Sequence, residues 1–323
     1  MAIGLASNFV IRDELFNSVF EEKVTQELNV FNAASGGGLR LQTQAMEGDY
    51  GKRRFFDRLT GTNNRRDTTS VSAQTDTALT MDEIISVKRS RKFKTHAQTF
   101  DAWEKLGLNS TQMNVMLAQN YADEQIKDFI EASVISLKNA IGDSATAITD
   151  YSATGVMAHA ALIDGLALFG DAAGDIKTWL GHSKVWFDLL DNSLSVSSGH
   201  VGPAAIYDAQ IGTLNRPLVM TDSTNFIITG TPNDYVTFGL VEGACVITMS
   251  ESKRFVADVV TGLENLVLRY QGEYAYNVEI KGHAWDTSTG STNPTDATLG
   301  TSGNWDIKVG HIKNGPGIYV RTQ

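Results

Sequence analysis

The stretch from Ser110 to Ile141 constrains the fold most, because it is long and contains neither proline nor glycine. Its apolar residues recur at steps of three and four, which places them on one face of a helix. These residues are Ile126, Ile130, Val134, Leu137 and Ile141. Residues 109–111 can cap the start of this helix, and Gly142 is expected to cap its end. At about 1.5 Å per residue the helix would be roughly 45 Å long, so we predict a spine onto which other elements pack.

Both helices and strands are predicted around this spine. Helices are predicted at residues 9–31, 156–169 and 183–190, and a short strand at 39–43 follows a glycine-rich break at 35–38. All five prolines lie beyond residue 200, where alternation predicts strands. The clearest strand is 273–281, and the others are 204–207, 218–221, 226–229, 235–240, 244–249, 255–260, 266–270, 305–309 and 318–320. The chain is therefore predicted to be an α+β protein of two or three lobes.

Charge is distributed unevenly along the chain. The formal net charge is −10, yet residues 50–99 carry eleven Lys or Arg and five Asp or Glu, which leaves −16 on the remainder. Such a segment is expected to contact an acidic partner, either nucleic acid or another copy of the chain. We favour another copy, because no nucleic-acid-binding signature accompanies the cations and the acidic remainder would repel DNA. The predicted contact residues are Lys52, Arg53, Arg54, Arg58, Arg65, Arg66, Lys88, Arg89, Arg91, Lys92 and Lys94.

The basic segment is predicted to project from the subunit. Residues 50–59 are expected to be a short helical patch and 60–80 a polar loop. Residues 83–99 are expected to form one long strand with charges on both faces, which does not suit a strand in the subunit's own core. Reversing the charges of Arg89, Arg91 and Lys92 should therefore block assembly and leave the subunit folded. By contrast, Ile130→Asp is expected to abolish folding, because Ile130 lies on the apolar face of the spine.

The sequence contains no motif of a catalytic or metal site. The six histidines have no metal-ligand spacing, and the glycines at 36–38 lack the Gly-Lys-Ser/Thr of a phosphate loop. Ser183, next to His182, is more plausible as a helix cap than as a nucleophile, and Cys245 as a buried apolar residue than as a reactive thiol. One cysteine and no apolar run of membrane-spanning length predict a cytosolic protein without disulfides. We expect no enzyme activity, no cofactor and no metal, and a structural or interaction role.

The order of these parts and several short motifs resemble the major capsid protein of tailed bacteriophages, which has the Hong Kong 97-type coat fold. The resemblance covers the chain from about residue 30 to its end. The motifs are residues 31–37 (FNAASGG), 48–50 (GDY), 170–173 (GDAA) followed by His182-Ser183, 214–222 (LNRPLVMTD), 293–299 (NPTDATL) and 304–306 (NWD).

This resemblance implies a role for each segment. Residues 1–44 would be an N-terminal arm, 45–99 an extension loop and 100–150 a peripheral domain with the spine helix. Residues 151–270 would be mainly an axial domain, and 271–323 would complete the sheets. The protein would self-assemble into pentamers and hexamers of an icosahedral head in the host bacterial cytoplasm. The implied partners are scaffolding, portal and decoration proteins and non-specifically packaged double-stranded DNA, without a membrane.

Two alternatives remain at the level of sequence. An encapsulin-type compartment shell shares the fold, although the long arm and loop argue against it. A nucleic-acid-binding protein would show DNA affinity that depends strongly on salt.

Overall fold

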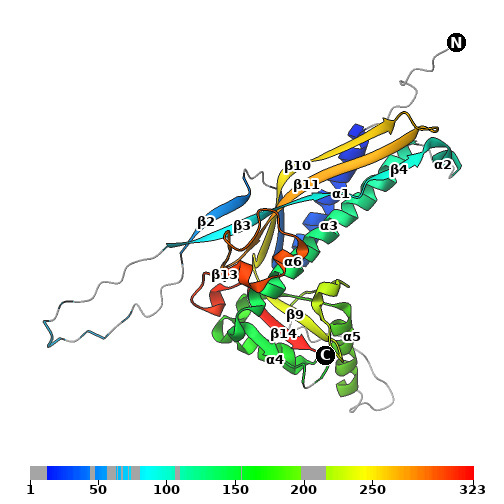
Figure 1. Ribbon diagram of the computed structural model, residues 1–323. Helices are drawn as coiled ribbons and strands as arrows, with labels where there is room; N and C mark the ends of the chain where they lie inside the picture. The colour runs from blue at the N-terminus through cyan, green and yellow to red at the C-terminus, as the bar shows by residue number, and fades with distance from the viewer. Residues whose placement is uncertain are drawn as a thin grey trace, which may run out of the picture.

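A computed structural model describes residues 13–43, 48–56, 63, 65–66, 68–71, 73, 81–105, 110–153, 155–197 and 216–323. A long sheet lies along the spine helix, a second lobe lies at one end of that helix, and a strand hairpin points away from both (Figure 1). The mixed helix and sheet content agrees with the α+β prediction. In the part of the chain that the structure describes, no helix is long and apolar enough to span a membrane.

The spine is helix α3, Ser110–Gly142. Its predicted apolar face is confirmed: Val134 and Leu137 are fully buried, Ile126 and Ile141 nearly so, and Ile130 is half-buried against the same core. The role expected for Gly142 is wrong. It is the last helical residue, and the next N–H, that of Asp143, still donates to the Asn139 carbonyl.

The long sheet, which we call sheet A, has the strand order β1-β10-β11-β3-β2, and β4 also pairs with β11. Its strands are β1 (Leu39–Thr43), β2 (Tyr50–Phe56), β3 (Met81–Lys92), β4 (His96–Thr99), β10 (Cys245–Val260) and β11 (Val267–Ile280). The helical patch predicted at 50–59 is wrong, because residues 50–56 pair with 81–87 as β2. The single strand predicted at 83–99 is interrupted at 93–95. The four strands predicted between 244 and 281 are two long ones, β10 and β11.

The core of this lobe is rich in aromatic residues. Helix α1 (Asp13–Ala34) inserts Phe16 and Phe20 between the spine and sheet A, where they meet Phe93, Tyr121 and Phe255 with ring centroids 5.0–6.2 Å apart. Edge-to-face and offset aromatic pairs stabilise such a core beyond the area they bury. Residues 13–43 of the predicted N-terminal arm therefore pack in the subunit core. The division of the chain into five domains stays a prediction.

One side-chain amide closes an edge of sheet A. The Asn32 amide nitrogen donates to the Leu41 carbonyl, and the Leu41 N–H donates to Asn32 Oδ1, both over 2.9 Å. The amide thus takes the place of a neighbouring strand at β1, an edge strand whose other side pairs with β10. Asn32 belongs to the motif at residues 31–37. Its hydrogen bonds to the backbone of β1 explain why an amide side chain is needed at this position of the motif.

We expect Asn32→Ala to lower the free energy of unfolding by about 1–2 kcal/mol, because it leaves the Leu41 backbone groups without partners at a half-buried site. Urea unfolding of the subunit measures this change. Asn29→Ala, at an exposed position of the same helix, is the control and should shift the midpoint little. Equal midpoints for the two variants would contradict the role of the amide.

The second lobe is built on sheet B, with the order β5-β14-β9-β6-β7 and β8 paired to β9. The strands are β5 (Ile148–Asp150), β6 (Ile176–Gly181), β7 (Leu218–Met220), β8 (Ile227–Ile228), β9 (Asp234–Val241) and β14 (Gly317–Thr322). Helices α4 (His159–Ala167) and α5 (Ser183–Ser197) belong to this lobe (Figure 1). The strand predicted at 204–207 lies outside the described residues. Lys138 of α3 joins the lobes by donating to the carbonyls of Asn225 (2.8 Å) and Ile227 (3.1 Å).

The glycine-rich break after α1 forms a tight turn. Gly36 has a φ of +57°, and a Cβ there would lie 2.7 Å from Thr178 Oγ1. Only glycine fits both conditions, since the left-handed region strains other residues. The Thr178 hydroxyl in turn donates to the Ser35 carbonyl, so the turn is held against sheet B.

A third group of short elements covers the end of sheet A. It consists of β12 (His283–Trp285), α6 (Asp296–Leu299) and β13 (Trp305–Ile307), and β12 pairs with β13. Trp285 and Trp305 are fully buried and meet edge-to-face at 5.0 Å, and the Trp305 indole N–H donates to the Leu299 carbonyl. The remaining helix, α2 (Phe100–Lys105), was not predicted. The 3-10 turns are 145–147, 170–175, 224–226, 302–304 and 312–314.

Candidate assembly surface

The basic segment forms the hairpin of β2 and β3, whose far end points away from the body (Figure 1). Strand β3 pairs with β2 along its first half and with β11 along its second half. The same strand therefore belongs both to the subunit core and to the projection. This arrangement divides the cations of the segment into a buried group and an exposed group.

Arg89 belongs to the buried group. Its side chain is 1% exposed, and Nη1 donates to the Tyr276 hydroxyl over 3.0 Å, while Nη2 pairs with Asp296. Nε donates to the Pro294 carbonyl over 3.3 Å. The guanidinium therefore has a partner for each of its three nitrogens. Assigning Arg89 to a contact between subunits was wrong, because two segments of its own chain, about 200 residues away, enclose it.

Arg91, two residues further along β3, extends the same network to the spine. Its Nη2 lies 2.7 Å from Asp128 of α3 and 2.9 Å from Asp296 of α6, and the Tyr274 hydroxyl donates to Asp128 over 2.8 Å. Its side chain is only one-third exposed and is engaged within the subunit. The network ties β3, β11, α3 and α6 together at the base of the projection, and the assignment of Arg91 to the contact surface stays a prediction.

The electrostatics of the network agree with this geometry. Burial raises the pKa of Tyr274 and of Tyr276, and the charge of Asp128 raises them further, so both hydroxyls stay protonated donors. Burial alone would raise the pKa of Asp296, but the hydrogen bonds and charges of Arg89 and Arg91 outweigh it and lower that pKa. Asp296 is therefore ionised at neutral pH, and among the described residues Arg91 Nε is the one guanidinium nitrogen of Arg89 and Arg91 that is buried without a hydrogen-bond partner.

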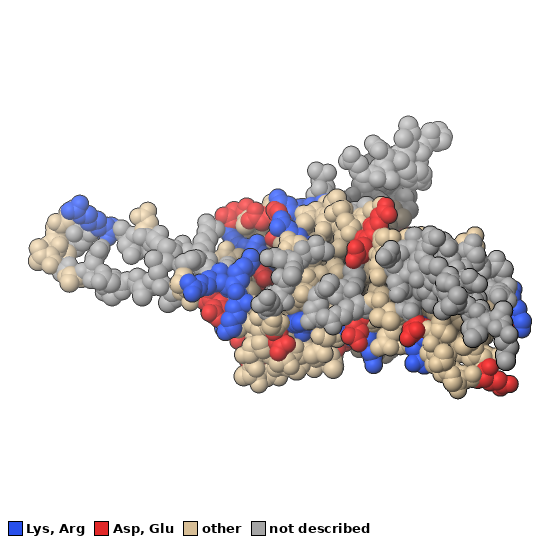
Figure 2. All heavy atoms as spheres, turned by 90° about the horizontal axis from the view of Figure 1, so that it is seen from above, with Lys and Arg blue, Asp and Glu red and all other residues tan. Residues whose placement is uncertain are grey.

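The exposed group lies on the hairpin and on its continuation. Lys52 pairs with Glu83 at 3.4 Å and Arg53 with Glu279, while Lys88 is half-buried. Figure 2 shows Lys and Arg side chains where the hairpin joins the body and again far out on the projection. The exposed cations are Lys52, Arg53, Arg54, Arg65, Arg66, Lys92 and Lys94, and Arg58 lies outside the described residues. Surface pairs of this kind add little stability, so these cations remain suited to contacts with another molecule.

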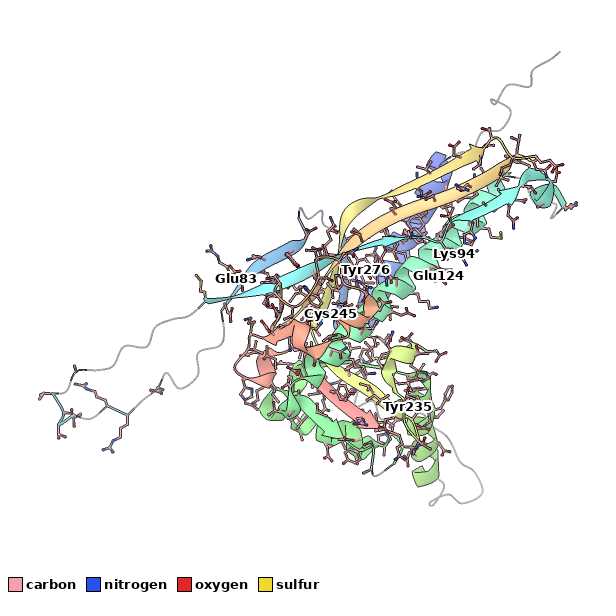
Figure 3. The ribbon with its side chains drawn as sticks, viewed as in Figure 1. Glu83, Lys94, Glu124, Tyr235, Cys245 and Tyr276 are labelled. Atoms are coloured by element: carbon pink, nitrogen blue, oxygen red, sulfur yellow. The ribbon has the colours of Figure 1, made fainter. Side chains whose placement is uncertain are left out.

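A groove of about 500 Å³ lies between the bend that follows β3 and the spine. Lys92 and Lys94 line it from the bend, and Glu124 and Glu131 line it from α3. Figure 3 labels Lys94 and Glu124, one from each wall. Cations and carboxylates therefore face each other across this groove.

The residues that could have suggested catalysis have structural roles. His182 Nδ1 accepts the N–H of Lys184 over 3.1 Å, so His182 rather than Ser183 caps α5. Cys245 is buried as predicted, and burial raises the pKa of its thiol to about 12. Among the described residues, no group of three His, Cys, Asp or Glu could hold a metal ion.

The fold places the chain in a structural class, that of solved bacteriophage capsids. In solved structures, the capsid of Helicobacter pylori bacteriophage KHP30 matches with a TM-score of 0.55 at 12% identity, over 90% of this chain and 89% of that one. The cyanophage Pam1 capsid matches with 0.52 at 14% identity, over 75% and 84%. Mycobacterium phage Adephagia matches with 0.51 at 10% identity, over 88% and 87%.

A family model gives the particular assignment. The model of major capsid protein 13-like (Gp13-like) proteins matches residues 8–319. The chain belongs to this family and is a bacteriophage major capsid protein with the Hong Kong 97-type fold, as the resemblance implied. No curated protein matches the chain.

Proposed function

We propose that the protein assembles into the pentamers and hexamers of an icosahedral head that encloses double-stranded DNA. The observation that supports this most is the division of the hairpin cations. Arg89 and Arg91 fix the base of the hairpin in the core, and the exposed cations extend from that fixed base. A rigid base with a charged projection is suited to reach a neighbouring subunit in a defined direction.

The acidic surface that receives these cations is proposed to lie on another copy of the chain. Residues 143–250, which include most of sheet B, carry eleven Asp or Glu and three Lys or Arg. Complementary charge steers association and fixes the relative position of partners. The virion is the proposed location, assembly takes place in the host cytoplasm, and the role is structural rather than enzymatic. Scaffolding, portal and decoration proteins are the further proposed partners.

The triple variant Arg54→Glu, Arg65→Glu and Arg66→Glu tests this function. All three side chains are exposed, so the melting temperature of the free subunit should change by less than about 2 °C. Particle yield, measured by sedimentation and negative-stain electron microscopy, should fall at least tenfold, because like charges would meet across the contact.

The matched control replaces the same three arginines with lysine, which keeps the charge, and this variant should assemble. Part of the wild-type yield should also be lost near 1 M salt, where the screening length is about 3 Å. Normal particles from the glutamate variant would refute the role of the exposed cations. A wild-type subunit that stays monomeric under every assembly condition would refute the shell itself.

A further inference from the structure

His283 occupies the place where the two lobes meet. It begins β12, directly after the turn that ends β11, and pairs with Ile307 of β13. The walls around it come from the end of α3 (Ile141), from residues 144–147 and from residues 315–317, which lead into β14 of sheet B. The ring is 2% exposed, so it is part of the packing between the lobes.

Two backbone carbonyls act on this ring. Nδ1 lies 3.2 Å from the Lys281 carbonyl oxygen, and the Ala140 carbonyl, in the last turn of α3, also favours the protonated ring. A neutral imidazole has one N–H and can donate to only one of these oxygens. Nε2 has no hydrogen-bond partner within the described part of the chain. The neutral ring is therefore incompletely bonded at a site where an unpaired polar atom is costly.

A cavity of about 110 Å³ adjoins the ring. Its walls include the apolar side chains of Ile141, Ile307 and Ile312, with Ser144 and Thr146 at one side. A space of this size can hold several water molecules, provided that they find polar partners. Water can therefore reach the ring after a small displacement of the 305–317 segment.

The charged groups on the surrounding elements are few. Asp143 follows α3 and acts on the ring, and His311 lines the cavity with its Nδ1 accepting the Lys313 N–H. Lys281 lies in the turn between β11 and His283, and Lys308 pairs with Asp306. On β3, which packs against β12, Arg89 is held by Asp296. Asp143, which is exposed, is the carboxylate whose charge raises the pKa of the ring.

We propose that His283 makes the contact between the two lobes sensitive to protons, so that mild acid opens the β12–β13 hairpin and the cavity behind it. In the closed joint the ring is buried and neutral. In the open joint the ring is hydrated and accepts a proton, with Asp143 and the carboxyl end of α3 favouring the cation. Acid therefore stabilises the open form relative to the closed one. The opening is confined to the contact between the lobes around His283, and the rest of the subunit stays folded.

The direction of the pH dependence follows from the pKa of His283 in the closed form. Burial lowers the pKa of His283 below its ordinary value of 6.5, against the smaller opposite effects of the Lys281 and Ala140 carbonyls and Asp143. A group whose pKa is depressed on closing contributes full stability above the pKa of the open form. That contribution is lost as the pH falls below about 6.5 toward the pKa of the closed form.

Hydrogen exchange of the full-length subunit between pH 7.5 and pH 5.0 tests the proposal, with rates corrected for the intrinsic pH dependence. In the wild type, the opening equilibrium of peptides covering 283–312 should rise by up to about tenfold per pH unit below 6.5, because one proton is linked to opening. His283→Gln should remove this dependence, and so should His283→Phe if the glutamine variant folds poorly. His311→Gln, at an exposed histidine of the same cavity, should keep it.

Three results would overturn the proposal. The first is a wild-type response that persists in both His283 variants. The second is a response that disappears in His311→Gln. The third is acid-induced exchange that rises equally in α3 and sheet A, which would show global unfolding and not a local joint.

Discussion

Replacing Arg89 with glutamate is expected to unfold the subunit. The side chain is buried against Tyr276 and faces Asp296, so a carboxylate there would meet another carboxylate and lose all three hydrogen bonds. Breaking a buried ion pair in this way costs about 3–5 kcal/mol, before the added repulsion is counted. That is a large share of the 5–15 kcal/mol that stabilises a typical domain. Circular dichroism and soluble yield at 25 °C measure the effect.

Lys92→Glu is the matched control, since Lys92 lies on the same strand and is exposed. It should leave the melting temperature within about 2 °C of wild type. This outcome would separate two residues that the sequence places in one group. If Arg89→Glu folds with a normal melting temperature, then the network at the base of the hairpin does not hold the subunit together.

Leu137→Asp should have an effect of similar size through the spine. Leu137 is fully buried, so the variant loses its packing and places an unpaired carboxylate in the core, at a cost of more than about 4 kcal/mol. Ile130→Asp should be milder than the sequence predicts, because Ile130 is half-buried. Lys127→Asp, at an exposed position of α3, is the control and should retain the fold. Thermal melting ranks the three variants, and any other order would contradict the packing of α3.

The sequence predicts well those elements whose pattern is local. The spine, strand β1 and the start of α5 have the predicted positions, because steps of three and four or alternation repeat over their own length. Tyr274 and Tyr276, two positions apart in the clearest predicted strand, lie on one face of β11 with their rings stacked. In α1, by contrast, the buried Phe16 and Phe20 pack on Tyr121, Phe93 and Phe255, which lie far away in the sequence.

The sequence-based predictions are wrong where the conformation of a segment depends on a partner far away in the sequence. Residues 50–56 are a strand because 81–87 lie beside them, and β10 continues through a charged stretch, with two irregularities in its pairing, because β11 accompanies it throughout. The charges on both faces of residues 83–99 predicted a strand outside the subunit core. The partner of Arg89, however, is Asp296, about 200 residues later, and no local pattern connects them. The exposure of Lys52, Arg53, Arg54, Arg65, Arg66, Lys92 and Lys94 agrees with the sequence, whereas the burial of Arg89 and the partial burial of Arg91 and Lys88 required the fold.

The strand order of sheet A determines how late in protein synthesis this sheet can be completed. Strands β1, β2 and β3 lie within the first 92 residues, but β10 and β11 stand between β1 and β3, and β11 ends at Ile280. At 5–20 residues per second, the ribosome needs roughly 10 to 40 seconds to pass from residue 92 to residue 280. Before that time the base of the hairpin cannot form, because Tyr276 and Asp296, which hold Arg89 and Arg91, have not yet been synthesised. A nascent chain on the ribosome therefore cannot present the hairpin in its final direction, and subunits join only after their synthesis is nearly complete.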